Sequence, residues 1–375
     1  MSHVQKRGAR WQARYRGPDG RERSRRFDRK VDAERWLDLN GADIARGRWV
    51  DPRLGQTMLR EWSEKWAATT AANRPSTRER DARYLRTHIL PAFGDRSLSS
   101  VTHLEVRGWV AELSTRKAPA TVRLASQMLA KIMGAAVDAG VLANNPCDRV
   151  PLPRIEREEM RFLTPEEVER FARAVAPRYR ALVLVGAYGG LRIGEMAALR
   201  RGRVDILRGR VDIAETCVEV SGHLIFNQPK TRAGRRSVSL PRSVASVLGD
   251  HLAHFTEANP NALVFTAPEG GPLRPASWRR RYWHPAVIEA GLNPLRPHDL
   301  RHTAVALWIA SGANPLEVSR RAGHTSTSFT QDRYGHLFPE ADAALAERLE
   351  SLLSAPVRER GTEGVKLALP SSQGS

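Results

Sequence analysis

A chain of 375 residues is long enough for two or three domains, each with a hydrophobic core of its own. It carries 60 lysines and arginines against 41 acidic residues, a formal charge of +19, which favours a polyanionic partner: nucleic acid before a membrane surface. The chain has no apolar run near the ~20 residues of a membrane span, no apolar signal at its start and only two cysteines, so we expect a cytoplasmic protein.

The start of the chain is strongly basic, with eleven lysines and arginines against three acids in its first 30 residues. Apolar and polar residues alternate over 11–16 and 21–27, and the turn signal GPDG lies between these two stretches. A helix is expected to follow over 32–46. Residues 1–55 are therefore predicted to be a small α+β domain whose basic strands contact DNA; the alternative is a solvated hairpin that caps the next domain.

Residues 56–150 are predicted to be all-helical, because apolar side chains recur there at spacings of three and four residues. Trp62 and Trp66, one turn apart, are expected in the core of this domain rather than stacked on bases. The following residues, 151–160, continue a stretch with three prolines and a run of charges, which predicts a linker.

A third domain, mixed α+β, is expected over residues 161–354. Its first helix begins at Thr164, a good N-cap that is followed by proline and two glutamates. Residues 204–240 are predicted to form a three-stranded sheet with turns at Arg208-Gly209 and Ala233-Gly234. The tail, 355–375, is polar and rich in small residues, and is predicted to be disordered. The whole chain is therefore expected to be multidomain and mainly α.

Three motifs carry the chemistry. GLRIGE ends at Glu195, HDLRH begins at His298, and AGHTSTSFTQDRYGHL begins at Ala322. Together they supply arginines, histidines and a tyrosine, groups that can cleave a phosphodiester without a metal ion. Guanidinium groups bind non-bridging oxygens bidentately and match the charge of the transition state, while tyrosine is a competent covalent nucleophile.

Lys230 is unusual because the chain uses 53 arginines and only seven lysines, and it is the one lysine between Lys131 and Lys366. A general acid for a leaving 5′-oxygen must release a proton, which an ammonium of lowered pKa can do and a guanidinium effectively cannot. The sequence after Lys230 is expected to be a hairpin tip that reaches a minor groove. The alternative is that one lysine persisted by chance.

The motifs resemble those of the tyrosine recombinase (phage integrase) family. The resemblance implies a catalytic set of Arg192, Lys230, His298, Arg301, His324 and Tyr334. It also implies an arm-type DNA-binding domain over 1–55, a core-binding domain over 56–150, and a mixed α+β catalytic domain that needs no metal ion or other cofactor.

In this set Tyr334 would be the nucleophile and the two arginines would clamp the phosphate. His298 would orient or deprotonate the tyrosine, and His324 would donate a hydrogen bond to the phosphate unless it is a capping or core histidine. His302 falls outside the set, which favours a structural role. The charged neighbours of Tyr334 indicate a position outside the core, and Glu195 is expected to fix Arg192 by an ion pair; a purely structural ion pair is the alternative for that arginine.

We therefore predict a site-specific recombinase that cuts and rejoins double-stranded DNA through a 3′-phosphotyrosyl bond. An integrase of a phage or integrative element fits the basic start best, and a Xer-type chromosome or plasmid resolvase is the second candidate. A type IB topoisomerase and a non-catalytic DNA-binding protein are further alternatives. A metal-dependent transposase is disfavoured, because it would need clustered acids in the catalytic region.

The expected partners are attachment sites in double-stranded DNA, an excisionase or DNA-bending accessory protein, and further copies of the chain, with no membrane. The protein would be a monomer or weak oligomer alone and a homotetramer on synapsed DNA. Residues 342–353 are predicted to be a helix with leucines along one side, among them Leu345 and Leu349. This helix is expected to dock on a neighbouring subunit; packing on its own domain is the alternative.

Overall fold

The computed structural model describes residues 2–47, 49–156, 160–229 and 231–338, together with residues 346, 349, 350 and 353. Among these residues, no helix is both long and apolar enough to cross a bilayer. Lys230, the tail 355–375 and most of the predicted leucine-bearing helix lie outside the described residues. The chain divides into two compact units, residues 1–159 with 218–225 and residues 160–217 with 226–375.

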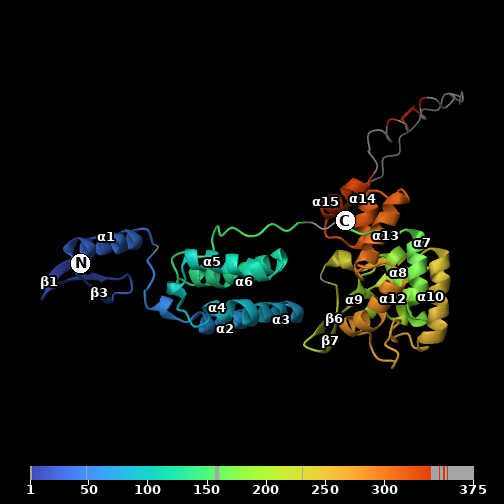
Figure 1. The fold of residues 1–375 in the computed structure, drawn as a ribbon, viewed down its shortest axis with the longest axis horizontal. Coiled ribbons are helices and arrows are strands. Elements are labelled where there is room, and N and C mark those ends of the chain that lie inside the picture. The colour runs from blue at the N-terminus through green and yellow to red at the C-terminus, as the bar shows by residue number, and fades with distance from the viewer. Residues whose placement is uncertain are drawn as a thin grey trace, which may run out of the picture. The chain divides into compact units, whose positions relative to one another are not determined.

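The first unit opens with a three-stranded antiparallel sheet of β1 (His3–Arg7), β2 (Arg10–Arg16) and β3 (Glu22–Phe27), covered by α1 (Lys30–Ala45) (Figure 1). The predicted pair of strands and the helix are confirmed, and β1 is an additional strand. Trp36 of α1 packs against Tyr15 and Phe27, with ring centroids 5.1 and 5.8 Å apart. Since strand side chains alternate between faces, these contacts leave the other face of the sheet uncovered by α1.

Residues 54–138 of the first unit are mainly helical, as predicted. Its elements are η1 (Leu54–Gln56), α2 (Leu59–Thr69), α3 (Pro75–Tyr84), η2 (Leu85–Ile89), α4 (Leu90–Phe93), η3 (Leu98–Ser100), α5 (His103–Arg116) and α6 (Pro119–Asp138). α2 and α5 both pack on α6. Trp62 and Trp66 lie against this core, and the indole N–H of Trp62 donates to the carbonyl of Ile132 at 3.0 Å, so the prediction that they are core residues is confirmed.

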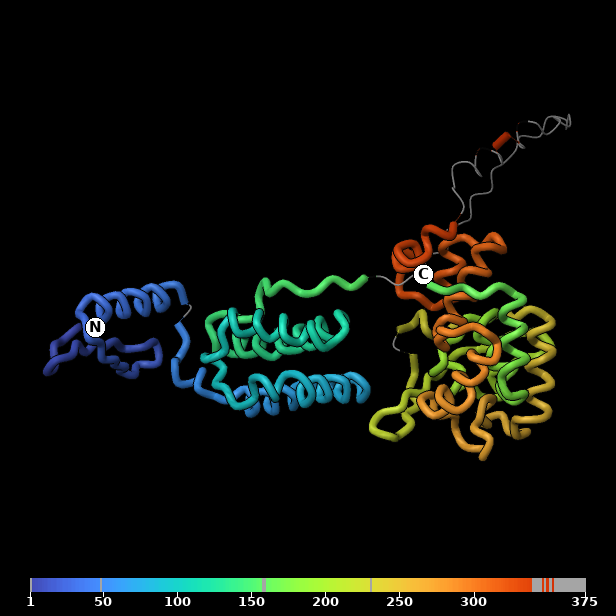
Figure 2. Tube along the Cα trace, viewed as in Figure 1, coloured from blue at the N-terminus to red at the C-terminus, as the bar shows by residue number. Residues whose placement is uncertain are grey.

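The second unit is built around α8 (Pro177–Gly189), which packs against α7 (Pro165–Ala174), α10 (Arg242–Phe255) and α13 (Asp299–Ala310). Thr164 caps α7 in a capping box with Glu167, which confirms the predicted helix start. Its remaining helical elements are α9 (Ile193–Ala197), η4 (Arg201–Arg203), α11 (Pro275–Trp278), η6 (Arg279–Trp283), α12 (His284–Glu289), α14 (Pro315–Ala322), α15 (Thr327–Tyr334) and η7 (Gly335–Leu337). Helices α13, α14 and α15 follow one another in orange to red in Figure 2, and α14 contacts both α13 and α15.

The three-stranded sheet predicted over residues 204–240 is present, with its turn at Arg208-Gly209, but the described part of this region holds five strands rather than three. β4 (Val204–Asp205), β5 (Arg210–Ile213) and β8 (Arg236–Ser239) form the three-stranded sheet, whereas β6 (Thr216–Val220) and β7 (His223–Asn227) form a separate hairpin. The tip of that hairpin is Ser221-Gly222, whose φ values of 49° and 78° suit a two-residue turn. Ala233-Gly234 lies instead in the 3-10 turn η5 (Arg232–Gly234) between two sheets, so it is not a hairpin tip.

Candidate active site

Five of the six predicted catalytic residues are described, and all five lie at helix ends in the second unit. Arg192 is the N-cap of α9, and His298 is the N-cap of α13. Arg301 lies in the first turn of α13, His324 directly follows the α14 C-cap, and Tyr334 is the last residue of α15. The candidate site is therefore built from the ends of four helices, where backbone N–H and C=O groups lack partners within the helix. Lys230 lies outside the described residues.

Arg192 is held by Glu195, as the sequence predicts. Its Nη1 donates to Glu195 Oε1 at 2.7 Å, and its backbone N–H donates to the other carboxylate oxygen at 2.8 Å. Burial by itself would raise the pKa of Glu195, but hydrogen bonds from Arg236 and the charges of Arg236 and Arg192 lower it, so this carboxylate is ionised. The Arg192 side chain remains 40% exposed, which leaves it free to meet a ligand.

Arg236 joins the same carboxylate and was missed from the sequence. Its Nη1 and Nη2 donate to the two oxygens of Glu195 at 3.1 and 3.0 Å. The RRSVSL stretch alternates like any strand, and only the three-dimensional structure determines which of its arginines lies at Glu195. A bidentate contact of this kind is strong and directional.

Arg301 is almost completely buried, at 2% exposed, and its hydrogen bonds go to carbonyls. Nη1 donates to Gly190 at 2.6 Å and Nη2 donates to Ala322 at 2.5 Å. Both carbonyls lie at the C-terminal ends of helices, α8 and α14, where the helix dipole favours a cation. Burial, then the charges of Arg192 and Arg236, lowers the pKa of Arg301 to about 9, so it remains charged at neutral pH.

The charges at this site do not balance. Three guanidinium groups, those of Arg192, Arg236 and Arg301, surround the single carboxylate of Glu195, which leaves an excess of two positive charges. An uncompensated positive cluster that is partly buried stabilises a bound anion strongly, because solvent screens it little. The arrangement is therefore suited to a phosphate group.

Tyr334 is buried, at 2% exposed, which corrects the expectation that it lies outside a core. It packs with Val305, Ile309 and Val318, while the adjacent charged residues Asp332 and Arg333 are exposed. On a helix, adjacent residues point in different directions, so charged neighbours in sequence say little about the side that a tyrosine faces.

The histidine next to the tyrosine is His302, not His298. The ring nitrogen Nδ1 of His302 lies 2.6 Å from the hydroxyl of Tyr334. His298 is exposed and its ring meets that of His302 edge-on, with centroids 4.7 Å apart; in the described part of the chain no hydrogen bond joins it to Tyr334. The sequence favoured a structural role for His302, and the structure places this residue directly beside the tyrosine hydroxyl. His302 lies four residues after His298, so both histidines are on one face of the helix. This spacing is the sequence signal that could have placed His302 near the tyrosine.

His324 also lies beside the tyrosine ring. The two rings are nearly parallel, at 7°, with centroids 6.4 Å apart, and Nδ1 of His324 lies 2.8 Å from the hydroxyl of Thr330. Its backbone N–H donates to the carbonyl of Ser319, so His324 also closes the C-terminal end of α14. Burial, then the charges of Arg301 and Arg192, lowers the pKa of His324 to about 3, which makes it neutral at pH 7.

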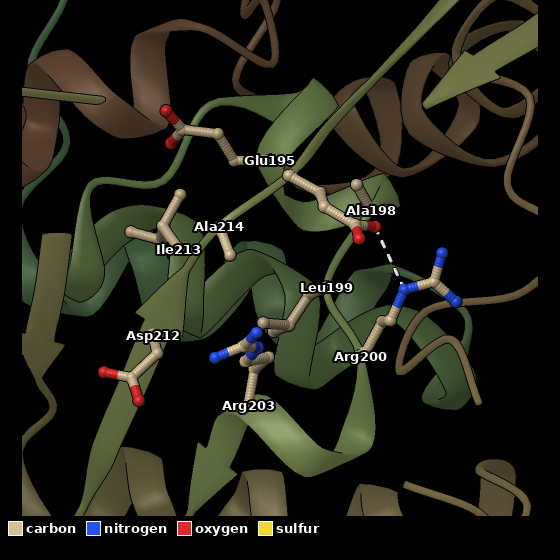
Figure 3. A pocket seen from close by; sticks show the side chains of 9 residues that line it. Glu195, Ala198, Leu199, Arg200, Arg203, Asp212, Ile213 and Ala214 are labelled. Atoms are coloured by element: carbon tan, nitrogen blue, oxygen red, sulfur yellow. Dashed lines mark hydrogen bonds and ion pairs between the residues drawn. The ribbon is translucent and has the colours of Figure 1, made fainter. Parts of the chain in front are cut away.

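A small pocket behind Glu195 is not part of this arrangement. Its volume is about 20 Å³, which holds little more than one water molecule. Figure 3 shows the Glu195 carboxylate pointing away from Arg200 and Arg203, which also line the pocket, and Arg200 pairs with Glu215 at 3.0 Å. These two arginines are therefore separate from the positive cluster.

Acid is expected to destabilise the protein through His302. Burial, then the charges of His298 and Arg333, lowers the pKa of His302 from 6.5 to about 4. The unfolded state therefore binds more protons between these two pH values, so the stability from neutral His302 is present above 6.5 and is lost as the pH falls toward 4. At pH 5 the loss should be about 2 kcal/mol relative to pH 7.

Urea unfolding of full-length protein at pH 7 and pH 5 measures this loss. The His302→Gln variant should lose less stability than the wild type, because an amide does not titrate. His254→Gln, at an exposed position of α10, is the control and should follow the wild type. Equal losses for the wild type and His302→Gln would contradict the expectation.

A positive cluster beside a tyrosine suits proteins that handle phosphodiesters, and comparison with known families identifies the class. Three family models match: the phage integrase N-terminal domain over residues 4–46, the phage integrase central domain over 56–151 and the phage integrase family over 161–341. The chain is 32% identical over 354 residues to the phiRv2 prophage integrase of Mycobacterium tuberculosis, covering 92% of this chain and 93% of that protein. The chain belongs to the phage integrase family and is a tyrosine-type site-specific recombinase.

Two solved structures share the fold. The integrase of the Tn1549 transposon, in complex with a circular intermediate DNA, has a TM-score of 0.66 and 18% identity, covering 79% of this chain and 99% of that chain. The lambda integrase tetramer bound to a Holliday junction has a TM-score of 0.55 and 15% identity, covering 85% and 90%. The expected multidomain, mainly helical fold with a mixed α+β catalytic domain is confirmed.

Proposed function

We propose that this recombinase is the integrase of a phage or integrative element and acts through a 3′-phosphotyrosyl intermediate. Tyr334 attacks a backbone phosphate, and the 5′-hydroxyl that leaves then attacks the corresponding bond of a partner strand. The energy of the phosphodiester is kept, so neither ATP nor another cofactor is needed. The observation that carries the proposal is the cluster of three arginines and one glutamate beside this tyrosine. The phage and prophage names of its relatives support the integrase subtype.

Each proposed catalytic residue has a distinct task. Arg192 and Arg301 bind the non-bridging oxygens and match the charge that grows on them. His324 donates a hydrogen bond to the phosphate, and Lys230 is the general acid for the 5′-oxygen. His298 stays in the proposed set as the exposed histidine that faces incoming DNA.

His302 receives the phenolic proton in this scheme, a task that the sequence assigned to His298. With its ring neutral at pH 7, Nδ1 can accept that proton across the 2.6 Å contact with Tyr334. Burial raises the pKa of Tyr334, so the hydroxyl remains protonated until a base acts. The buried hydroxyl must be brought to the phosphate before attack, and we assign the described arrangement to the state that precedes it.

We propose residues 1–55 as the arm-type DNA-binding domain, 56–150 as the core-binding domain, 151–160 as the linker and 161–354 as the catalytic domain. The sheet face opposite α1 supports the first assignment. By strand alternation this face carries five arginines: Arg7, Arg10, Arg14, Arg16 and Arg26. A face lined with basic side chains can contact several phosphates of a duplex at once.

The proposed partners are attachment sites in double-stranded DNA and three further copies of the chain. One crossover exchanges two strands in each of two duplexes, so four phosphates are cut, and each cut needs one tyrosine. A homotetramer on synapsed DNA meets this requirement, with a monomer or weak oligomer in its absence. An excisionase or a DNA-bending protein would set the direction of the reaction.

The function is tested by recombination between two DNA molecules, one carrying the ends of the element and the other its insertion site. An integrase yields hybrid junctions between the two different sites. A Xer-type resolvase would instead join two copies of one site, and a type IB topoisomerase would relax a supercoiled plasmid that lacks both. Relaxation without hybrid junctions would refute the proposal.

Neutralising exposed arginines on the sheet face should weaken arm-site binding and flatten its salt dependence. Arg7, Arg16 and Arg26 are exposed, and the variant replaces all three with glutamine. If each contacts one phosphate, the slope of log affinity against log salt should fall by about 2.7, since each lost contact removes about 0.9. Cleavage at the core site should persist. Fluorescence anisotropy over a salt series measures the slope.

The control for this variant is Arg35→Gln, an exposed arginine of α1 that lies away from the sheet face. It changes net charge without touching the proposed contact surface, so its slope should equal that of the wild type. An unchanged slope in the triple variant would show that the sheet face does not bind DNA.

A further inference from the structure

The last turn of α14 contacts all three arginines of the positive cluster. Three consecutive carbonyls accept hydrogen bonds there: that of Arg321 from Arg236 Nε at 2.8 Å, that of Ala322 from Arg301 Nη2, and that of Gly323 from Arg192 Nη2 at 3.4 Å. The C-terminal end of a helix carries partial negative charge, which offsets the repulsion between guanidinium groups. His324 follows Gly323 directly in the sequence. This one turn therefore contacts three arginines and carries a histidine of the candidate site.

Arg236 differs from the other two arginines because its hydrogen-bonding atoms are already occupied. Nε donates to Arg321, Nη2 donates to Glu195, and Nη1 donates both to Glu195 and to the carbonyl of Gly234. Its side chain is 6% exposed, against 40% for Arg192. A guanidinium with every nitrogen engaged and no open face cannot bind a phosphate, so any effect of Arg236 on catalysis must pass through its neighbours.

Gly323 allows the turn after α14 to approach Arg236 closely. Its φ is +66°, and a Cβ at this position would lie 2.7 Å from the carbonyl of Ala233 and 3.0 Å from Nη1 of Arg236. The turn at Gly323 thus packs directly both on the backbone that precedes β8 and on the Arg236 side chain. Movement of Arg236 would therefore displace both the Glu195 carboxylate and the turn at the end of α14.

We infer that Arg236 is a positioning residue, which holds the Glu195 carboxylate and through it Arg192 in a fixed relation to the turn that carries His324. The inference rests on the proposed roles of Arg192 and His324. Glu195 has two oxygens and two arginine partners, so loss of the bidentate contact from Arg236 lets the carboxylate turn, and Arg192 turns with it. A small displacement of a charged group in an active site lowers the reaction rate without a loss of binding.

The test is the Arg236→Lys variant in the full-length protein, assayed on a nicked suicide substrate that traps the covalent adduct. An ammonium can reach one carboxylate oxygen but cannot span both oxygens and the Arg321 carbonyl. We expect the single-turnover rate of adduct formation to fall about 100-fold, while the Kd for a half-site changes less than about twofold. Arg201→Lys is the matched control, since Arg201 also donates to carbonyls in this unit, those of Leu252 and Thr256, and its rate should be unchanged.

A substrate with an uncharged methylphosphonate at the cut site separates positioning from general damage. A misplaced guanidinium matters through the charge on the phosphate, so on this substrate the deficit of Arg236→Lys should shrink to within about threefold. A wild-type rate for Arg236→Lys on the normal substrate, or a deficit of equal size on both substrates, would overturn the inference. Failure of the wild type to form any adduct would refute the proposed function instead.

If Arg236→Lys does not fold, as shown by the absence of a melting transition, the Glu195→Gln variant tests the same inference. It removes the charge that both arginines share, and should show the same split between rate and Kd and the same recovery on the methylphosphonate. Where both single variants fold, the double variant should be no more than about threefold slower than the slower single, because both act through one contact. Additive deficits would show that Arg236 does not act through Glu195.

Discussion

Replacing Tyr334 with phenylalanine is expected to abolish covalent attachment to DNA while leaving half-site binding within about twofold of the wild type. The substitution removes only the nucleophilic oxygen. The ring keeps its contacts with Val305 and Ile309 in the buried cluster, so the fold should survive the loss of the hydrogen bond to His302. That loss should lower the free energy of unfolding by about 1 kcal/mol.

A suicide substrate with a nick beside the cut site measures this result, because the wild-type adduct accumulates and is resolved on a denaturing gel. Tyr179→Phe is the matched control. Tyr179 is equally buried in the same unit, and its hydroxyl donates to the carbonyl of Thr266 at 3.3 Å, so its loss removes one buried hydroxyl without touching the site. An adduct formed by the Tyr334→Phe variant would mean that another residue is the nucleophile.

Arg192→Lys should have the second largest effect, slowing adduct formation by about 10² to 10³-fold. A lysine keeps the positive charge but cannot present two parallel N–H groups to a phosphate. Glu195 remains paired with Arg236, so its buried carboxylate is not left without a partner and the protein should stay folded. Binding of the half-site should change little, because a single charge-conserving substitution leaves the electrostatic attraction intact.

Single-turnover cleavage by Arg192→Lys is best compared with Arg200→Lys. Arg200 lines the small pocket together with Glu195, pairs with Glu215 at 3.0 Å, and has a side chain that is 31% exposed (Figure 3). Its substitution should leave the cleavage rate unchanged. A rate for Arg192→Lys within about threefold of the wild type would exclude a transition-state role for this arginine.

Local sequence was enough to predict most elements of the fold and one ion pair of the candidate site. Alternation over residues 11–27 predicted two strands, and the capping sequence at Thr164 predicted the start of α7, because each depends on neighbours a few residues apart. GLRIGE likewise predicted the ion pair of Arg192 with Glu195, three residues on. The layout of β6 and β7 was missed, since pairing partners in a sheet depend on which strands meet in space.

The sequence by itself determined which kinds of groups the site holds and that the protein is strongly basic, because motif spacing and charge are properties of the chain. Only the tertiary structure decided how these groups meet. Arg236 reaches Glu195 across 41 residues, and Tyr334 reaches His302 across 32. Which residues are buried, and which distant residues they meet, depends on how the helix ends pack. The period of a strand or helix shows which residues lie on the same face, but it does not show what covers that face.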